Sequence, residues 1–167
     1  MQGRILTMAL LHETLYRVGS FASVELGAYL RQLATQTFRA QSSQMATVRL
    51  SLDVAEVQVV MDQATPCGLL VNELLSNCLK HAFPDGRTGE VQVRLQPDQQ
   101  AGRWLVQVRD DGVGLPPDFE LRGRQSLGLQ LVSDLARQLD GTLQVDSSAG
   151  TTFTVTFQRV PIKSPAA

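Results

Sequence analysis

The sequence predicts an α/β fold of two layers, a mixed sheet with helices on one face, preceded by an N-terminal helix. Segments with apolar residues at helical spacing are interspersed with short alternating segments that end at Gly or Pro turns. The 167 residues, 43% of them hydrophobic, suffice for one core of ordinary size. We therefore expect one domain over residues 21–160, an N-terminal helix within residues 1–20 and a disordered tail over residues 161–167.

Composition and charge exclude several classes of protein. A net charge of −1 and the absence of a basic run exclude a general attraction to nucleic acid or to membrane surfaces. No apolar stretch is long enough to span a bilayer and no signal peptide is present, so we expect a cytoplasmic, soluble chain without direct membrane contact. Cys67 and Cys78 form no metal-ligand pattern and are expected to be buried, reduced thiols.

The first half of the chain alternates helical and strand patterns. An amphipathic run predicts a helix near 3–17, and Ser23 can cap a second helix near 24–41. Alternating segments then predict a strand over 47–53 and a short one near 56–60. A long apolar run predicts a helix from about Thr65 to Phe83, with Pro66 in its first turn.

The second half is expected to supply most of the sheet. The turn Pro84-Asp85-Gly86 precedes strands 90–97 and 103–109, and a polar loop follows from Pro116 to Gln125. A helix over 126–140 ends at Gly141, and strands 142–147 and 151–158 complete the fold.

Four polar residues share one face of the expected helix 65–83. Glu73, Asn77, Lys80 and His81 recur at helical spacing inside an otherwise apolar run. A carboxylate and an amide one turn apart are hard oxygen ligands suited to Mg²⁺, while Lys and His suit phosphate oxygens. The alternative is an ordinary solvated helix face.

A glycine turn follows the expected strand 103–109. In Asp110-Asp111-Gly112-Val113-Gly114, two glycines let the backbone approach a planar ligand, and Asp110 can accept a hydrogen bond from an exocyclic amine. The alternative is a turn that ends a strand for structural reasons only.

The last helix begins with a second candidate motif. Ser126 is a candidate N-cap, and Gly128 in the first turn leaves backbone N–H groups open to an anion. The alternative is a glycine needed for helix packing. Thr151 starts the alternating strand 151–158, where threonine is also a common β-former.

In this order, the segments resemble the N, G1 and G2 boxes of the gyrase, chaperone, histidine kinase and mismatch-repair ATPase superfamily, over roughly residues 62–158. The resemblance implies the Bergerat-type ATP-binding fold, with ATP and Mg²⁺ as cofactors. It implies that Asn77 coordinates Mg²⁺ and is catalytic together with Glu73, which can hold the metal through water. It further implies that Asp110 binds the adenine amino group.

The same resemblance assigns the remaining ATP contacts. Lys80 and His81 would contact phosphates, and Thr151 would support the hydrogen bonds of the adenine. The backbone at Gly112 and Gly114 would close over the nucleotide. The implied set is completed by Leu115, Ser126, Leu127, Gly128 and Leu129, the last two lining the phosphate end.

The N-terminal segment is similar to one branch of this superfamily. The run from Arg4 to Tyr16 resembles the end of the second dimerisation helix of sensor histidine kinases related to the HWE subfamily, so residues 1–20 would be a remnant of that helix. The form Asn-Glu-Leu-x-x-Asn-x-x-Lys-His-Ala of the N box is also typical of it. The chain departs from the pattern because Ser126 replaces a common glycine and the Trp-x-Glu feature around Trp104 is missing.

The resemblance implies the ATP-binding catalytic domain of a two-component histidine kinase. Its γ-phosphoryl group would pass to a histidine on an acceptor helix of the parent kinase, outside this chain, and then to an aspartate of a response regulator. A homodimer and a monomer are both compatible with so short a helix. His12, followed by Glu13, imitates an acceptor site, but the resemblance assigns this pair to the distal helix. The alternative functions are a serine kinase that inhibits a sigma factor and a non-catalytic nucleotide-binding module.

Overall fold

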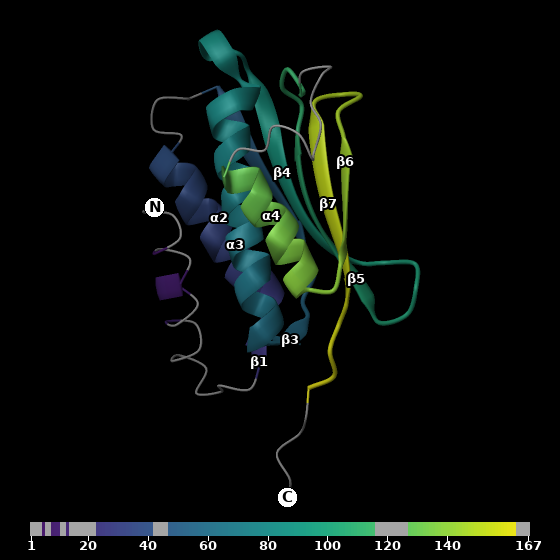
Figure 1. Cartoon of the computed structure of the whole chain (residues 1–167). Helices are drawn as coiled ribbons and strands as arrows, with labels where there is room; N and C mark the ends of the chain where they lie inside the picture. Colours follow the sequence, from purple (N-terminus) through teal and green to yellow (C-terminus); the bar gives the residue numbers. More distant parts are fainter. Residues whose placement is uncertain are drawn as a thin grey trace, which may run out of the picture.

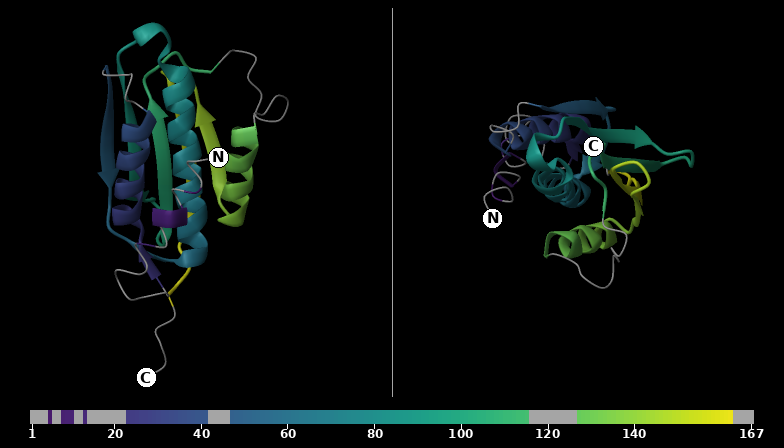
Figure 2. Two further views of the ribbon diagram at one scale, coloured as in Figure 1. Left: turned by 90° about the vertical axis from the view of Figure 1, so that its left-hand side faces the viewer. Right: turned by 90° about the horizontal axis from the view of Figure 1, so that it is seen from above.

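The fold consists of a layer of helices packed on one face of a sheet (Figures 1 and 2). The computed structural model describes residues 23–41, 47–115 and 127–162, together with residues 5, 8–10 and 13. The two-layer α/β architecture with a mixed sheet is therefore confirmed. The expected loop 116–125, the tail from residue 163, His12 and Ser126 lie outside the described residues, as does most of the expected helix 3–17.

The main sheet has five strands, in the spatial order β2 (Val48–Val54), β4 (Gly89–Pro97), β5 (Arg103–Asp110), β7 (Thr151–Gln158) and β6 (Thr142–Asp146). β2 runs parallel to β4, and the other neighbouring pairs are antiparallel. Two short strands, β1 (Ser23–Glu25) and β3 (Gln58–Val60), form a separate antiparallel pair. The parallel pair requires a crossover, which the helix between β2 and β4 provides.

The helix layer contains α2 (Leu26–Gln41), α3 (Met61–Asn77) and α4 (Leu127–Gln138). α3 lies between the other two helices and packs on β5, while α2 covers β2 and α4 covers β6. A π-helical turn, η1 (Cys78–Ala82), continues α3, and a short 3-10 turn, η2 (Pro84–Gly86), follows it. Because α3 packs on β5, the turn that follows α3 lies next to the turn that follows β5.

The core lies between the two layers because the strands alternate. On β4, Val91, Val93 and Leu95 are fully buried, whereas the intervening side chains are partly exposed on the other face of the sheet. Leu70 and Leu74 of α3 are fully buried in the same hydrophobic core. Truncating a leucine in such a position typically costs about 2–5 kcal/mol. The face of the sheet that carries no helix is lined by polar side chains, and we call it the open face.

The start of α2 differs from the sequence prediction. A helix over 24–41 with Ser23 as its cap was expected, but residues 23–25 form β1. Val24 is buried and pairs with Val59, and the Glu25 carboxylate accepts hydrogen bonds from the Ala28 and Val57 backbone N–H groups. Glu25 therefore caps α2, because one carboxylate satisfies donors on both sides of the strand pair.

The helix that carries Glu73 and Asn77 also begins and ends at other residues than the sequence predicts. α3 starts at Met61, so Pro66 lies in its second turn and not in its first. Proline lacks an N–H group, and the Asp62 carbonyl loses its helical partner as a result. The α-helix ends at Asn77, and the last expected turn is a π turn over Cys78–Ala82. That change affects where the side chains after Asn77 point.

α4 ends two residues earlier than the expected helix over 126–140, although the expected stop, Gly141, does close it. α4 ends at Gln138, and Asp140 adopts the left-handed backbone conformation, with φ of 50°. The Gly141 N–H donates to the Ala136 carbonyl at 2.9 Å, which closes the helix end. A Cβ on Gly141 would lie 2.6 Å from the Thr156 carbonyl oxygen, so glycine is needed for close packing on β7.

Among the described residues of the N-terminal segment, Leu10 is buried. Residues 5, 8–10 and 13 are helical, as expected, and Leu10 belongs to the hydrophobic core. Ile5 and Met8 are exposed. Among the described residues, no helix has the length and apolar content needed to cross a bilayer.

Candidate functional site

The turn after β5 holds a buried carboxylate. Val106, Val108 and Asp110 alternate toward the helices, and the Asp110 side chain is only 3% exposed. Its Oδ1 accepts a hydrogen bond from the Gly112 N–H at 2.9 Å. Thr151, the first residue of β7, lies directly opposite Asp110 and is also buried. Burial of a carboxylate is costly unless it is hydrogen-bonded, and the Gly112 N–H supplies such a bond here.

The four polar residues on α3 and η1 are the least buried positions between residues 70 and 82. Glu73 and Asn77 are partly exposed, and Lys80 and His81 are exposed, while the side chains between them are buried. The expected shared face therefore agrees with the burial pattern. Asn77 is the last α-helical residue, and the π turn places Lys80 and His81 beyond it. π turns occur frequently at functional sites.

The π turn and the glycine turn contact each other closely. The Val113 N–H donates to the Ala82 carbonyl at 3.0 Å. A Cβ on Gly112 would collide with that same carbonyl oxygen, so only glycine fits there. Cys78, at the start of the π turn, is buried, and burial together with the nearby charge of Asp110 raises the pKa of its thiol. The end of the helix formed by α3 and η1, which we call the N-box helix, therefore packs directly on the turn Asp110–Gly114, which we call the Asp110 turn.

A second glycine supports the same turn from β7. Gly150 adopts φ of 80°, and a Cβ there would collide with the backbone carbonyl of Asp110. Gly114 also has a positive φ, of 78°, and lies against Gly150. Thr151, Gly150 and Asp110 thus meet where β5 ends and β7 begins.

The start of α4 supplies the other predicted residues. Gly128 is partly exposed in its first turn, and Leu129 is buried. Leu115 is partly buried at the end of the described glycine turn. The backbone of Leu127 begins α4, but its side chain and Ser126 lie outside the described residues. α4 packs on α3, which brings this helix start to the same side of the sheet as Asp110.

The donor set on α3 fits a magnesium ion. Glu73 and Asn77 offer a carboxylate and an amide oxygen one helical turn apart. Mg²⁺ takes one or two protein oxygens and completes its octahedron with water and phosphate oxygens. Within residues 23–41, 47–115 and 127–162, no group of three His, Cys, Asp or Glu side chains forms a metal cage. Such a site would therefore depend on phosphate oxygens.

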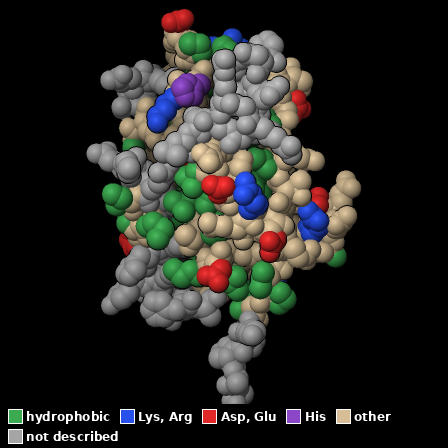
Figure 3. Space-filling model, viewed as in Figure 1, with side chains coloured by type: hydrophobic (Ala, Val, Ile, Leu, Met, Phe, Trp, Pro, Cys, Tyr) green, Lys and Arg blue, Asp and Glu red, His purple; other side chains and the backbone are tan. Residues whose placement is uncertain are grey.

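Charges around the helices are mixed. Figure 3 views the molecule from the side shown in Figure 1, and acidic and basic side chains are interspersed there among hydrophobic and polar ones. No large patch of one sign marks the described part of this face. Recognition of an anion would therefore rely on local groups and not on a broad field.

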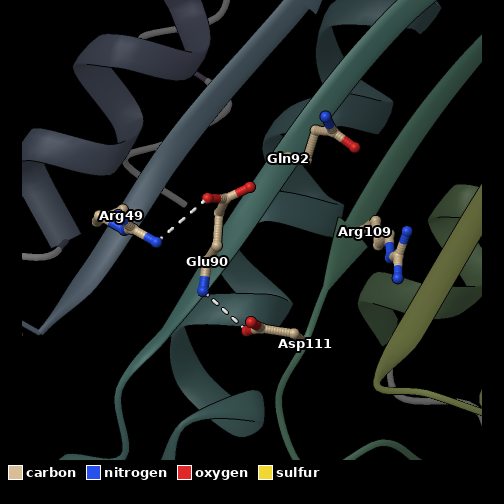
Figure 4. Close-up of a pocket in the computed structure, with 5 residues that line it drawn as sticks. All are labelled: Arg49, Glu90, Gln92, Arg109 and Asp111. Carbon is tan, nitrogen blue, oxygen red and sulfur yellow. Dashed lines mark hydrogen bonds and ion pairs between the residues drawn. The ribbon is translucent and has the colours of Figure 1, made fainter.

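A hollow on the open face was not predicted. It has a volume of about 340 Å³ and is lined by Arg49, Glu90, Gln92, Arg109 and Asp111 (Figure 4). The Arg49 guanidinium lies 3.7 Å from the Glu90 carboxylate, and the Asp111 carboxylate accepts a hydrogen bond from the Glu90 N–H at 2.8 Å. Its two cations and two anions balance. Only the alternation of the strands, combined with the correct strand order, could have indicated it.

Comparison with known proteins identifies the family. Residues 62–161 match the model of the histidine kinase-, DNA gyrase B- and HSP90-like ATPases, and residues 1–41 match a histidine kinase model. A blue-light-activated histidine kinase of Erythrobacter litoralis is 34% identical over 140 residues, which are 83% of this chain and 39% of that protein. The sensor histidine kinase PdtaS of Mycobacterium tuberculosis is 44% identical over 85 residues, or 49% of this chain and 16% of that protein.

Solved structures agree with this match. The histidine kinase domain of an Erythrobacter litoralis blue-light-activated kinase superposes with a TM-score of 0.85 and 29% identity, covering 95% of this chain and 74% of that one. The chain spans 39% or less of the full length of the two curated relatives described above. The glycine turn after Asp110 and the four polar residues from Glu73 to His81 both lie within the residues that match the family model. The chain therefore belongs to the histidine kinase-, DNA gyrase B- and HSP90-like ATPase family.

Proposed function

We propose that this chain is the ATP-binding catalytic region of a two-component sensor histidine kinase. The observation that carries the proposal is the buried Asp110 carboxylate, held by the Gly112 N–H at 2.9 Å beside the helix that bears Asn77. A buried carboxylate at a glycine turn is suited to an exocyclic amine, and adenine carries one. The family match and the names of the relatives support the kinase assignment.

The nucleotide would lie between the Asp110 turn, the N-box helix and the start of α4. Asp110 would accept from the adenine amine, and Thr151 would complete the hydrogen bonds of the base. Gly112, Gly114 and Leu115 would close over the nucleotide. The phosphate end would be contacted by Lys80 and His81 and lined by Gly128 and Leu129, with Ser126 and Leu127 at the helix start. Exposed basic groups and helix N–H groups are suited to phosphate oxygens.

Asn77 would hold Mg²⁺ directly, and Glu73 would hold it through water. The ion supplies neutralisation of charge on the phosphate oxygens. A neutral imidazole is already nucleophilic, so Glu73 need not act as a strong base. Lys80 and His81 would position the γ-phosphoryl group for in-line attack, and positioning with charge stabilisation accounts for most catalysis of phosphoryl transfer.

The partners follow from the same proposal. The acceptor would be a histidine on a helix outside this chain, and the phosphoryl group would then pass to an aspartate of a response-regulator receiver domain. Such a kinase can form a homodimer through its acceptor helices. The proposal places these reactions in the cytoplasm, where ATP and the receiver domain are available.

Calorimetry with ATP and Mg²⁺ tests the nucleotide site. Wild-type protein should bind, and Asn77→Ala and Asp110→Ala should each weaken binding at least tenfold, because each removes a group that contacts the ligand. The matched control is Asp111→Ala, which changes the adjacent carboxylate on the open face. Unchanged affinity in both test variants would refute the site.

Transfer is tested separately. A helix that carries an acceptor histidine, taken from a similar kinase, is supplied in trans with labelled ATP. Acid-labile phosphate on that helix would support the kinase. Phosphate on the serine of an anti-anti-sigma protein would support a serine kinase instead. ATP binding without transfer to any acceptor would favour a non-catalytic nucleotide-binding module.

A further inference from the structure

Two side-chain hydrogen bonds join α2 to the second half of α3, beside the residues proposed to hold Mg²⁺. The Thr37 hydroxyl donates to the Asn72 amide oxygen at 3.1 Å, and the Gln41 amide donates to the Ser76 hydroxyl at 2.8 Å. Thr37, Asn72 and Ser76 are buried, with exposed fractions of 2%, 3% and 8%. None of these four side chains belongs to the site predicted from the sequence.

The two bonds repeat with the same spacing on both helices. Thr37 and Gln41 are one turn apart on α2, and each bond joins residues 35 positions apart, so the acceptors are one turn apart on α3. α2 and α3 therefore run in the same direction here, and they lie side by side (Figures 1 and 2). Together the two bonds fix the rotation of α3 about its axis and its position along α2, because either movement would break the geometry of at least one bond.

The proposed magnesium donors lie on the adjoining face of the same helix. Glu73 and Asn77 each directly follow one of the bonded residues, and both are partly exposed. Successive residues are about 100° apart around an α-helix, so the rotation that is fixed at Asn72 and Ser76 also sets the direction of the two donors. The bonded face and the donor face cannot turn independently.

Small rotations of α3 matter for this ion. Side-chain tips lie about 5–6 Å from a helix axis, so a rotation of about 15° moves an oxygen by roughly 1.4 Å. Mg²⁺ requires near-octahedral geometry with oxygens at about 2.0–2.1 Å, and a displacement of that size takes the oxygen out of coordination distance. Apolar packing is not directional and fixes a rotation less sharply than buried hydrogen bonds do.

We infer that Asn72 and Ser76, held by side chains of α2, are positioning residues that set the strength of Mg²⁺ binding by fixing the rotation of α3. The inference rests on the proposed function and deepens it. It gives α2, which supplies no predicted site residue, a part in metal binding. The bonded side chains act through Glu73 and Asn77 and are not themselves metal ligands.

The experiment measures ATP affinity by calorimetry on the full chain and its variants, once with saturating Mg²⁺ and once with excess EDTA. The ratio of the two affinities, which we call the metal ratio, gives the contribution of the ion. Asn77→Ala should reduce the metal ratio most, because it removes a proposed ligand. Thr37→Val removes the donor to Asn72 and should reduce the metal ratio about tenfold, the lower end of the effect of groups that orient metal ligands. Gln41→Met should reduce it less, because its bond is only partly buried.

Gln63 provides a matched control on the same helix. It is 5% exposed, and its amide donates to the Gln158 carbonyl at 2.8 Å and accepts from the Val160 N–H at 3.0 Å. It lies about 21 Å before Asn77 along the helix. Gln63→Met therefore removes buried hydrogen bonds of α3 far from the proposed donors and should leave the metal ratio unchanged. Thr37→Ser keeps the hydroxyl and should also keep the metal ratio.

A purely structural role gives a different pattern. A loss of stability lowers the melting temperature and weakens ATP binding alike with and without Mg²⁺, so the metal ratio does not change. A wild-type metal ratio in both Thr37→Val and Gln41→Met would overturn the inference, as would an equal fall in Gln63→Met. If Thr37→Val does not fold, Gln41→Met decides alone, because its position is partly exposed.

The same measurements separate this inference from the proposed function. If wild type does not bind ATP, or if Asn77→Ala keeps the wild-type metal ratio, the proposed site is wrong. If Asn77→Ala lowers the metal ratio while Thr37→Val and Gln41→Met keep it, only the positioning role is wrong.

Discussion

Asp110 and Asp111 are neighbours in the chain, yet they lie on opposite faces of the sheet. Asp110 is buried on the helix side, where its Oδ1 accepts from the Gly112 N–H at 2.9 Å. Asp111 is exposed on the open face, where it accepts from the Glu90 N–H at 2.8 Å and lines the hollow (Figure 4). One aspartate is thus a candidate ligand-binding group, whereas the next aspartate in the chain connects the end of β5 to β4 by a hydrogen bond. Side-chain alternation at the end of β5 causes the difference.

The strongest test of this comparison is a pair of substitutions. Asp110→Ala should lower ATP affinity about 100-fold or more, roughly 3 kcal/mol, because it removes a buried acceptor for the ligand and leaves the Gly112 N–H without its partner. Asp111→Ala should leave ATP affinity within about twofold. Calorimetry on both proteins measures the contrast, and chemical denaturation of Asp111→Ala should show a loss of about 1 kcal/mol in unfolding free energy. Equal effects on ATP affinity would show that the two faces are not separate.

Gly150 and Gly86 both have a positive φ, but only Gly150 packs against Asp110, so the two glycines test how closely the backbone is packed there. Gly150→Ala should destabilise the protein by about 3 kcal/mol, because it adds left-handed strain and a collision with the Asp110 carbonyl. Gly86→Ala has the same kind of strain, with φ of 72°, but no atom within 4 Å of the new Cβ, so about 1 kcal/mol is expected. Denaturation curves measure both values. A Gly150 variant as stable as the Gly86 variant would contradict the close packing at Asp110.

Much of this arrangement could be predicted from residue patterns. The alternation of Thr151–Gln158 marked β7 correctly, and the spacing of Glu73 and Asn77 placed both on the less buried side of α3. β1 was missed because so short a strand is determined by its pairing with β3 and by the hydrogen bonds that the Glu25 carboxylate accepts. One of these comes from the Val57 N–H, which is 32 positions away in the sequence. Local sequence does not contain that pairing.

The π turn and the hollow were missed for related reasons. The π turn depends on the contact between Val113 and Ala82, 31 positions apart in sequence, and helix propensity favours an ordinary α-helix there. The hollow joins Arg49 of β2 with Arg109 of β5, which requires the order of strands in the sheet. Motif spacing could indicate the candidate nucleotide residues, but not the surfaces that nonlocal pairing creates.

The buried thiols make the helix side sensitive to alkaline pH. The pKa of Cys67 is raised by burial from 9.0 to about 12. Between these values the unfolded chain releases a proton that the folded chain retains, so stability is complete below pH 9 and falls as pH rises. In this window Cys67 lowers the unfolding free energy by about 1.4 kcal/mol per pH unit. Urea unfolding of wild type and Cys67→Val at pH 8 and pH 10 should show a shallower loss in the variant. An identical pH dependence would contradict the burial of the thiol.

The smallest effect is expected on the open face. The Arg49 and Glu90 side chains are 82% and 41% exposed and 3.7 Å apart. Exposed ion pairs contribute about 0–1 kcal/mol, so Arg49→Ala should change the unfolding free energy by less than about 0.5 kcal/mol and leave ATP affinity unchanged. Thermal denaturation and calorimetry check both statements. A large loss of ATP affinity would mean that the hollow communicates with the Asp110 side.

The π turn also limits how the length of this chain can change. A π turn holds one more residue than an α-helical turn, so winding the same residues of Cys78–Ala82 as an ordinary α-helix would rotate everything after them by about 100° around the helix axis. The Ala82 carbonyl would then turn away from the Val113 N–H, and the glycine turn would lose its attachment. Removing one residue from the turn would let an α-helix form without that rotation. The length of this segment and its π winding are therefore matched to each other, and a one-residue insertion there would have to be matched in the loop after β5.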